Sequence, residues 1–396
     1  MKKLLRALVM ISASAVIGAI GTVTAAGASR LPAVCTTIVI RPVPTISDQY
    51  PVTLQRVAGN HVRFHQKAHS WLVPTRCLPV KTAPKLSGRP TKIISGPTYK
   101  FNSPVALALS RGHLFVANLY GNSVTELDAS TGALVRVISS PTYKFNAPGA
   151  LALSGSHLFV ANMYVSNGGN GRSVTELDAT TGTLVRVISG PAYKFDWPDA
   201  FALTGHDLFV ANDFGNSVTE LNASTGALVR VMSGPAYKFN SPAALALSRA
   251  HLFVANLYGN SVTELDASTG ALVRVISSPA PGALAVSGSH LFVASSWHNE
   301  LTELDATTGA LVRVISSPAY KFNDPGRLAL SGHDLFVANG KGDSITELDA
   351  TTGVLVRVMS GPAYKFNSPA ALALSNGHLF VANGFGRSVT ELLVAT

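Results

Sequence analysis

The residues best suited to chemistry in this sequence lie together in one short segment, Ser295-Ser-Trp-His-Asn-Glu300. His298 supplies an imidazole and Glu300 supplies a carboxylate two residues later, so the two could act as general acid and base. Trp297 beside them offers a flat apolar face on which a sugar can stack. The segment therefore predicts a ligand site, with His298 and Glu300 as the catalytic candidates if the protein is an enzyme. The alternative is a surface loop whose sequence has drifted.

A second group of candidates lies in loops that we expect on the same face as this segment. Asp-Trp-Pro-Asp at residues 196–199 replaces the Asn-Ser-Pro-Ala of a related loop, and six residues are inserted within residues 164–172. Variable loops on a rigid scaffold commonly form binding surfaces. The alternative to a binding surface is that these loops vary because they are the least constrained part of the fold. The expected ligand-binding residues are Trp297, His298, Glu300, Trp197, Asp196, Asp199, Tyr164 and Lys341.

Most other titratable side chains recur once per copy of a repeat, which favours a structural role. We expect each recurring Glu to face the Arg of the next strand, as Glu126 would face Arg136. Removing the recurring residues leaves His298 and Glu300 as the unmatched His and Glu of the repeat region. The recurring residues are His113, His157, His206, His251, His290, His333 and His378, and Glu126, Glu176, Glu220, Glu264, Glu303, Glu347 and Glu391.

The elements that must position these residues come from seven copies of one repeat of about 44 residues. Each copy holds four short runs rich in β-branched and aromatic residues, bounded by Gly, Asn, Asp, Ser or Pro. Such runs predict four antiparallel strands, and four strands per repeat of this length predict a propeller blade. The copies are marked by Leu-Phe-Val at Leu114, Leu158, Leu208, Leu252, Leu291, Leu335 and Leu379.

The two ends of the repeat region predict how the ring closes. The last copy stops after its third run, and an isolated fourth-type run, residues 91–95, precedes the first copy. Pairing these two segments removes an exposed sheet edge. The expected fold is all-β: a seven-bladed β-propeller with four antiparallel strands per blade, closed by an N-terminal strand that completes the last blade.

The repeat resembles the YVTN-type β-propeller repeat, a relative of NHL repeats. The resemblance rests on Leu114-Phe-Val-Ala-Asn118, Ser123-Val-Thr-Glu-Leu-Asp128 and Val135-Arg-Val-Ile138, and it extends over residues 91–396. It implies a bacterial binding protein that is secreted or attached to the surface. A related propeller family, the streptogramin lyases, is enzymatic, so the resemblance leaves catalysis open.

Composition narrows the function classes. Hydrophobic residues make up 47% and charged residues 13%, which excludes a disordered chain or a coiled coil. The net charge of +10 comes from the segment before residue 99, since the repeats beyond it carry 18 basic and 20 acidic residues. A nucleic-acid-binding protein would be expected to carry a basic face on its folded domain, so no nucleic-acid partner is expected. The sequence contains no nucleotide-binding loop and no metal-binding motif, and we expect no cofactor and no metal.

The N-terminus reads as an export signal. Lys2, Lys3 and Arg6 precede an uncharged apolar stretch and a small-residue cleavage site, so residues 1–28 are the expected signal peptide. The alternative is an uncleaved membrane anchor. Residues 29–90 form a small basic Pro-rich extension containing Cys35 and Cys77, for which export predicts a disulfide; two free thiols are the alternative. The propeller then spans residues 91–396.

Together these observations favour an exported, non-enzymatic binding or cell-surface interaction module, secreted or held at the cell surface. The alternative is a propeller enzyme of lyase or lactonase type that acts at the channel mouth, and a third reading is a structural surface-layer component. The expected ligand is a carbohydrate, a cell-wall component or a protein. We expect a monomer with no membrane span after signal cleavage.

Overall fold

The computed structural model describes residues 88–163, 172–248 and 250–394, together with six short strands between residues 22 and 77. The chain divides into two compact units, Met1–Thr82 and Ala83–Thr396. The expected signal peptide lies outside the described residues except for the strand Thr22–Val23. No helix in the described part of the chain is long and apolar enough to span a membrane.

The first unit contains two small antiparallel sheets, which its Pro-rich composition did not predict. One has the order β1-β2-β6 and the other β3-β4-β5. Cys77 lies in β6 opposite Ile38, whereas Cys35 lies outside the described residues, so the disulfide stays a prediction. The strands are β1 (Thr22–Val23), β2 (Ile38–Val39), β3 (Thr53–Val57), β4 (His61–Gln66), β5 (His69–Pro74) and β6 (Arg76–Cys77).

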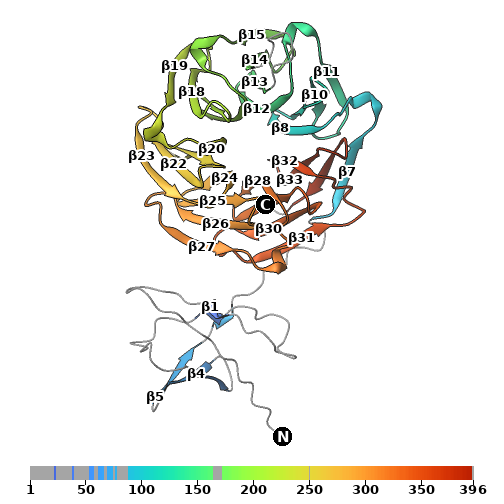
Figure 1. Ribbon diagram of the computed structural model, residues 1–396. Helices are drawn as coiled ribbons and strands as arrows, with labels where there is room; N and C mark the ends of the chain where they lie inside the picture. Colours follow the sequence, from blue (N-terminus) through green and yellow to red (C-terminus); the bar gives the residue numbers. More distant parts are fainter. Residues whose placement is uncertain are drawn as a thin grey trace. The chain divides into compact units, whose positions relative to one another are not determined.

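The second unit is a ring of seven four-stranded antiparallel sheets, the blades of a β-propeller (Figure 1). The first strand of each blade lies innermost and the fourth lies at the rim. Blade one is β8 (Pro104–Ser110), β9 (His113–Asn118), β10 (Ser123–Asp128) and β11 (Leu134–Ile138). Blade two is β12 (Pro148–Ser154), β13 (His157–Asn162), β14 (Ser173–Asp178) and β15 (Leu184–Ile188). Blade three is β16 (Pro198–Thr204), β17 (Asp207–Asn212), β18 (Ser217–Asn222) and β19 (Leu228–Ser233).

The remaining blades follow the same order, and the last is completed from the other end of the propeller unit. Blade four is β20 (Pro242–Ser248), β21 (His251–Asn256), β22 (Ser261–Asp266) and β23 (Leu272–Ser277). Blade five is β24 (Pro281–Ser287), β25 (His290–Ser295), β26 (Glu300–Asp305) and β27 (Leu311–Ile315). Blade six is β28 (Pro325–Ser331), β29 (Asp334–Asn339), β30 (Ser344–Asp349) and β31 (Leu355–Ser360). Blade seven is β32 (Pro369–Ser375), β33 (His378–Asn383), β34 (Ser388–Leu393) and β7 (Pro90–Ser95).

These sheets confirm the predicted fold and the predicted closure of the ring. The closing strand β7 pairs antiparallel with β34, and Ile94 lies opposite Val389. It begins at Pro90, one residue before the run expected from the sequence.

The second strand of each blade explains why the blades must form a ring. In β9, Leu114 and Val116 pack against Phe380 of blade seven. Phe115 points the other way and packs against Leu158 of blade two. Alternate residues of a strand face opposite sides of its sheet, so a strand that is apolar on both faces needs a neighbour on each side. A closed ring gives every blade two neighbours.

Segments that we call connectors join the fourth strand of one blade to the first strand of the next. A Pro-x-Tyr turn in the connector fixes the Tyr side chain, so that Tyr99 Oη donates to the carbonyl of Gly132 at 3.2 Å. Blade five lacks this turn, because only Ser278-Pro-Ala precedes β24. The turns that form 3₁₀ helices are η1 (Pro97–Tyr99), η2 (Pro141–Tyr143), η3 (Pro191–Tyr193), η4 (Pro235–Tyr237) and η5 (Pro318–Tyr320).

Each third strand buries a Glu, and the predicted pairing with the fourth strand is confirmed. Glu126 is fully buried, and its Oε2 lies 2.7 Å from Arg136 Nε. The His of the second strand adds a contact that was not predicted: His113 Nδ1 lies 2.8 Å from Glu126 Oε1. Burial raises the pKa of Glu126, and the nearby charges of Arg136 and His113 offset only part of that rise. In blade seven Lys92 of the closing strand replaces the Arg, 3.3 Å from Glu391.

Candidate functional site

One face of the ring carries the loops between second and third strands together with the connectors that lead into the next blade. We call the loops between second and third strands the crown loops. In blade one the crown loop is tied to the connector, since Leu119 N donates to Ser103 O at 2.9 Å and Tyr120 N to Asn102 O at 3.2 Å. The antiparallel strands place every crown loop at this same edge of its blade. We call this edge of the propeller the crown face.

The crown face carries large aromatic side chains that point into solvent. They occupy the same position of the crown loop in five different blades, and each is between 56% and 74% exposed. Folded proteins seldom leave a set of aromatic side chains this exposed unless the surface binds something. We call this set the aromatic crown: Tyr120, Phe214, Tyr258, Trp297 and Phe385. Blade six has Lys341 at this position, and the blade-two residue, Tyr164, lies outside the described residues.

The crown loops are held by a buried hydrogen-bond network at their base. Asn118, the last residue of β9, donates from Nδ2 to Thr125 Oγ1 at 3.0 Å. Thr125 Oγ1 in turn donates to the carbonyl of Tyr99 in the connector at 2.8 Å. Equivalent bonds recur in other blades, for example from Asn256 to Thr263. Buried hydrogen bonds of this kind restrain the local backbone, so the loops that carry them stand on a rigid base.

The blade-five residues predicted from the sequence lie on the crown face, where each has its own separate contacts. The Trp297 ring packs against Tyr258 of blade four, with ring centroids 5.5 Å apart. His298 Nδ1 lies 3.0 Å from Ser295 Oγ. Glu300 begins β26 opposite Ser295. No hydrogen bond or ion pair joins His298 to Glu300 within the described part of the chain.

Packing accounts for His298 where the other blades carry Gly. A Cβ on Gly121 would lie 3.0 Å from Asn118 Cβ and 3.4 Å from Asn102 Cβ, so these neighbours leave little room for a side chain. Blade five has Ser295 in place of that buried Asn, and its shortened connector removes the other neighbour. Ser295 keeps the Cβ of the Asn that it replaces, so the shortened connector is the change that removes a neighbour of the His298 position. The contact of His298 with Ser295 replaces part of the lost Asn network.

The other predicted residues fall into separate contacts on the crown face. Trp197 packs against Phe214 with ring centroids 4.7 Å apart. Asp196 Oδ1 lies 3.1 Å from Arg172 Nη2 of blade two. Lys341 Nζ lies 3.6 Å from Asp324 Oδ2.

Asp199 belongs to a group of charges at the crown end of the innermost strands. It is the second residue of β16, and Arg327 is the third residue of β28 in blade six. Asp213 follows β17 directly; its N–H donates to Trp197 O at 2.9 Å, and its Oδ1 accepts from Ser241 Oγ. Other blades carry only Val, Gly or Ala at the Asp199 position and only Ala at the Arg327 position. Each charge therefore occurs once in the ring.

These charges act on one another. Asp199 keeps limited contact with solvent but is enclosed by protein, and this desolvation raises its pKa to about 6. The charge of Arg327 acts in the opposite direction, and that of Asp213 adds to the rise. Burial also raises the pKa of Asp213, and the hydrogen bond from Ser241 limits that rise. The crown end of the innermost strands thus holds a carboxyl group whose pKa is raised to about 6.

This titration predicts a dependence of stability on pH. The folded pKa of Asp199 lies above its ordinary value of 3.8, so the folded state binds the proton more tightly. Stability should therefore fall as pH rises from about 4 to 6 and then level off. A fully buried group would contribute about 3 kcal/mol for such a shift, and limited exposure reduces our expectation to about 1–2 kcal/mol. Urea unfolding of Asp199→Asn and of the unmodified chain at pH 4.5 and 7.5 measures this. If the free energy of unfolding changes by the same amount between the two pH values in both chains, the prediction is wrong.

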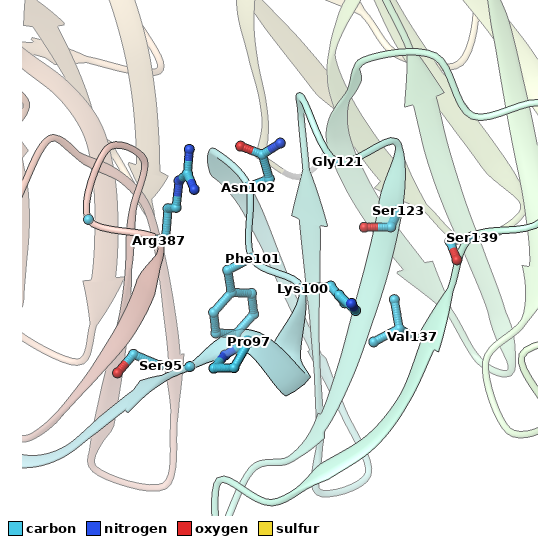
Figure 2. Close-up of a pocket in the computed structure, with 12 residues that line it drawn as sticks. Ser95, Pro97, Lys100, Phe101, Asn102, Gly121, Ser123, Val137, Ser139 and Arg387 are labelled. Carbon is cyan, nitrogen blue, oxygen red and sulfur yellow. The ribbon is translucent and has the colours of Figure 1, made fainter.

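Two hollows lie between neighbouring blades on the crown face. One, of about 680 Å³, lies between blades seven and one and is lined by Arg387, Lys100 and Asn102 (Figure 2). The other, of about 640 Å³, lies between blades two and three and is lined by Arg172 and Asp196 among others. Among the described residues no three His, Cys, Asp or Glu side chains group as metal ligands would.

Comparison with known proteins identifies the family and the fold. The family model described as outer membrane protein assembly factor BamB matches residues 79–313, 215–362 and 258–396. Overlapping matches are expected when similar blades repeat. No curated protein matches the chain.

Solved structures agree on the fold at low sequence identity. The computationally designed Ika8 protein has 15% identity and a TM-score of 0.55, covering 88% of this chain and 95% of its own. Selenomethionine-substituted virginiamycin B lyase from Staphylococcus aureus has 12% identity and a TM-score of 0.64, covering 77% and 99%. The WD40 repeats of RRP9 have 13% identity and a TM-score of 0.64, covering 78% and 100%. At these identities the likeness concerns the fold alone.

Proposed function

Because this chain belongs to the family described as outer membrane protein assembly factor BamB, we propose that it is an exported, non-enzymatic binding module that holds its ligand on the crown face. Family membership supports a propeller of repeated blades, and the resemblance of the repeat to the YVTN type adds the expectation of a surface-associated protein. The basic N-terminus followed by an apolar stretch supports export to the cell surface or beyond.

The aromatic crown is the observation that carries this proposal. Five aromatic side chains from five blades stand exposed around one end of the ring, and four of them stand on loops held by the buried Asn–Thr hydrogen bond. Aromatic side chains lose little entropy on binding because they have few rotatable bonds, and they offer large contact areas. A rigid set of them fits a ligand with repeated apolar faces, such as a carbohydrate or cell-wall polymer. A protein segment rich in apolar side chains would use the same surface.

Substitutions in the aromatic crown test this function. We expect Trp297→Ala and Phe385→Ala each to weaken binding about tenfold, since a buried aromatic contact at an interface contributes more than about 1 kcal/mol. Trp197→Ala should act in the same direction through loss of its contact with Phe214. Binding of the purified chain to cell-wall fragments and soluble glycans, measured by calorimetry, gives the affinities.

The matched control is Arg111→Ala. Arg111 is exposed in the turn between the first and second strands, at the opposite edge of blade one. Its loss should leave the affinity unchanged, and all variants should unfold at the same temperature. If a ligand ignores the three aromatic substitutions but loses affinity with Arg111→Ala, the crown face is not the binding face.

The channel mouth favours one alternative, a propeller enzyme of lyase or lactonase type. Asp199 has the raised pKa of a general base, and Arg327 is positioned to stabilise negative charge close by. In an enzyme, Asp199→Asn should abolish turnover and leave ligand affinity nearly intact, because a base acts mainly in the transition state. His298→Ala makes the same distinction for the loop in blade five. In a binding module, Trp297→Ala should cost more affinity than either change.

A further inference from the structure

The hollow between blades seven and one and the hollow between blades two and three are built from equivalent residues. Both are lined by a Ser-Gly-Pro turn, a Lys, a Phe and the Gly of a crown loop. Arg387 in the first corresponds to Arg172 in the second, and Lys100 corresponds to Lys194. The two sites differ at one polar position, where the first has Asn102 and the second has Asp196.

The last residue of the crown loop normally clamps the next blade. In five blades its side-chain oxygen accepts a hydrogen bond of 2.8 Å from a backbone N–H in the following connector. Four of these oxygens belong to Asn, and the fifth is a carboxylate oxygen of Asp343, which accepts from Ser368. An anionic oxygen therefore fits this position as well as an amide oxygen does. The clamps are Asn122 to Ala147, Asn216 to Ser241, Asn260 to Ala280, Asn299 to Asp324 and Asp343 to Ser368.

Blades seven and two have Arg at the clamp position, and Arg has no acceptor atom. In the connector that follows blade seven, the backbone N–H equivalent to those clamped in the other blades belongs to Ser103. Ser103 is only 8% exposed, and Arg387 cannot accept its hydrogen bond. Within the described part of the chain no hydrogen-bond acceptor is found for this N–H. Buried backbone donors are rarely left unpaired, because the lost hydrogen bond is costly. The connector into blade one therefore has an unpaired donor at Ser103, the residue that directly follows Asn102 in the lining of the hollow.

The two Arg residues differ in their counter-ions. Arg172 has its own, since its Nη2 lies 3.1 Å from Asp196 Oδ1. Arg387 has Asn102 in the equivalent place, and it forms no ion pair within the described residues. Lys100 lines the same hollow, is exposed, and has no acidic partner among the residues that the structure describes. The site between blades seven and one thus has two cations and a free N–H but no anion.

We propose that the hollow between blades seven and one binds a carboxylate group of a ligand, which accepts a hydrogen bond from Ser103 N–H and pairs with Arg387. Figure 2 shows that Arg387 comes from blade seven, whereas Asn102 and Lys100 come from blade one. The bound carboxylate completes the contact that Asn or Asp supplies in five other blades, and it neutralises Arg387 as Asp196 neutralises Arg172. The site is separate from the aromatic contacts of the proposed function and can be tested without knowing the ligand of the crown.

The test follows the Ser103 amide of the full chain, labelled with ¹⁵N-serine, while sodium acetate replaces sodium chloride at constant ionic strength. We expect a saturable shift of this resonance. Arg387→Asn rebuilds the clamp found in the other blades, and Asn102→Asp supplies an internal carboxylate. Each should weaken acetate binding at least tenfold.

Two kinds of result would overturn the proposal. An acetate titration that produces no saturable Ser103 shift, or a shift that both Arg387→Asn and Asn102→Asp leave unchanged, would show that the hollow is not an anion site. A parallel titration with inorganic phosphate separates the two oxyanions. Saturation by phosphate at tenfold lower concentration than acetate would assign the site to a phosphate group and contradict the carboxylate assignment. Both variants carry residues that this fold already accepts at equivalent positions, so loss of folding does not obscure the result.

Discussion

Removal of residues 1–97 is expected to open blade seven and cause the chain to aggregate, whereas removal of residues 1–87 should leave the ring intact. The two truncations differ by residues 88–97, which are the closing strand β7 and the two residues on each side of it. Without β7, the strand β34 becomes an unpaired edge, and an exposed edge of this kind readily pairs with another chain.

The contacts of β7 explain why the expected loss is large. Ile94 is almost fully buried and packs against Val389 and Phe380 of blade seven and Leu114 of blade one, so its removal opens the core between the two blades. Lys92 is the residue that pairs with the buried Glu391, at 3.3 Å. Gly88 N donates to Leu393 O at 2.6 Å and continues the ladder. The strand thus supplies an apolar contact, a charge partner and the backbone pairing of β34.

Thermal unfolding and light scattering of the two truncated chains measure the effect. The control is a circular permutant of the shorter chain, with residues 88–97 attached after Val394 by a short Gly-Ser linker. The hydrogen bond between Gly88 and Leu393 shows that the linker spans a small distance. The permutant should behave like the chain that lacks residues 1–87. A chain lacking residues 1–97 that stays monomeric with an unchanged unfolding temperature would contradict the role of β7 in closure.

The fold could be predicted because all seven blades repeat the same pattern of apolar and turn-forming residues. The second strand is apolar on both faces in all seven copies, so one pattern fixes the strands and the need for neighbours on both sides. The pairing of Glu126 with Arg136 followed from cross-strand register. The contact between His113 and Glu126 could not be predicted from the register, because it depends on the direction of the His113 side chain. The sheets of the first unit were missed since their strands carry no repeat.

The candidate site was only partly predictable. Trp297 could be predicted as a binding residue because it differs from the residues at the same position in other blades. Tyr120, Tyr258 and Phe385 were not predicted, because an aromatic residue recurs at this position in most blades. Their importance lies in exposure, which a sequence pattern does not state. Asp213 and Arg327 were also missed, although the seven copies of the repeat show that each is unmatched in the other blades. Asp213 lies in the same blade as Asp199, whereas the closeness of Arg327 depends on ring closure, which brings together residues more than a hundred positions apart.

Arg136→Met is expected to destabilise the propeller by about 3–5 kcal/mol at neutral pH, because it leaves a buried carboxylate without its main partner. Glu126 is fully buried, and the guanidinium lies 2.7 Å from its Oε2. The same side chain links two blades, since Arg136 Nη2 also donates to Thr180 O at 2.8 Å. Urea unfolding of the chain that lacks residues 1–87, followed by far-ultraviolet circular dichroism, measures the change in the free energy of unfolding.

The sign of the pH dependence separates an unpaired charge from a simple loss of packing. Burial already raises the pKa of Glu126, and removing Arg136 takes away the largest opposing influence, so the pKa in the variant rises further. The folded variant then binds a proton more tightly than the unfolded chain, and its stability should recover as pH falls from about 7 towards 4.5. The double variant Glu126→Met with Arg136→Met removes both charges and should regain most of the loss, as apolar replacements of buried ion pairs do. If Arg136→Met loses the same free energy at pH 5 and pH 7.5, and the double variant is no more stable, then the loss arises from the contact with Thr180 and from packing. In that case Glu126 does not depend on Arg136 as its counter-charge.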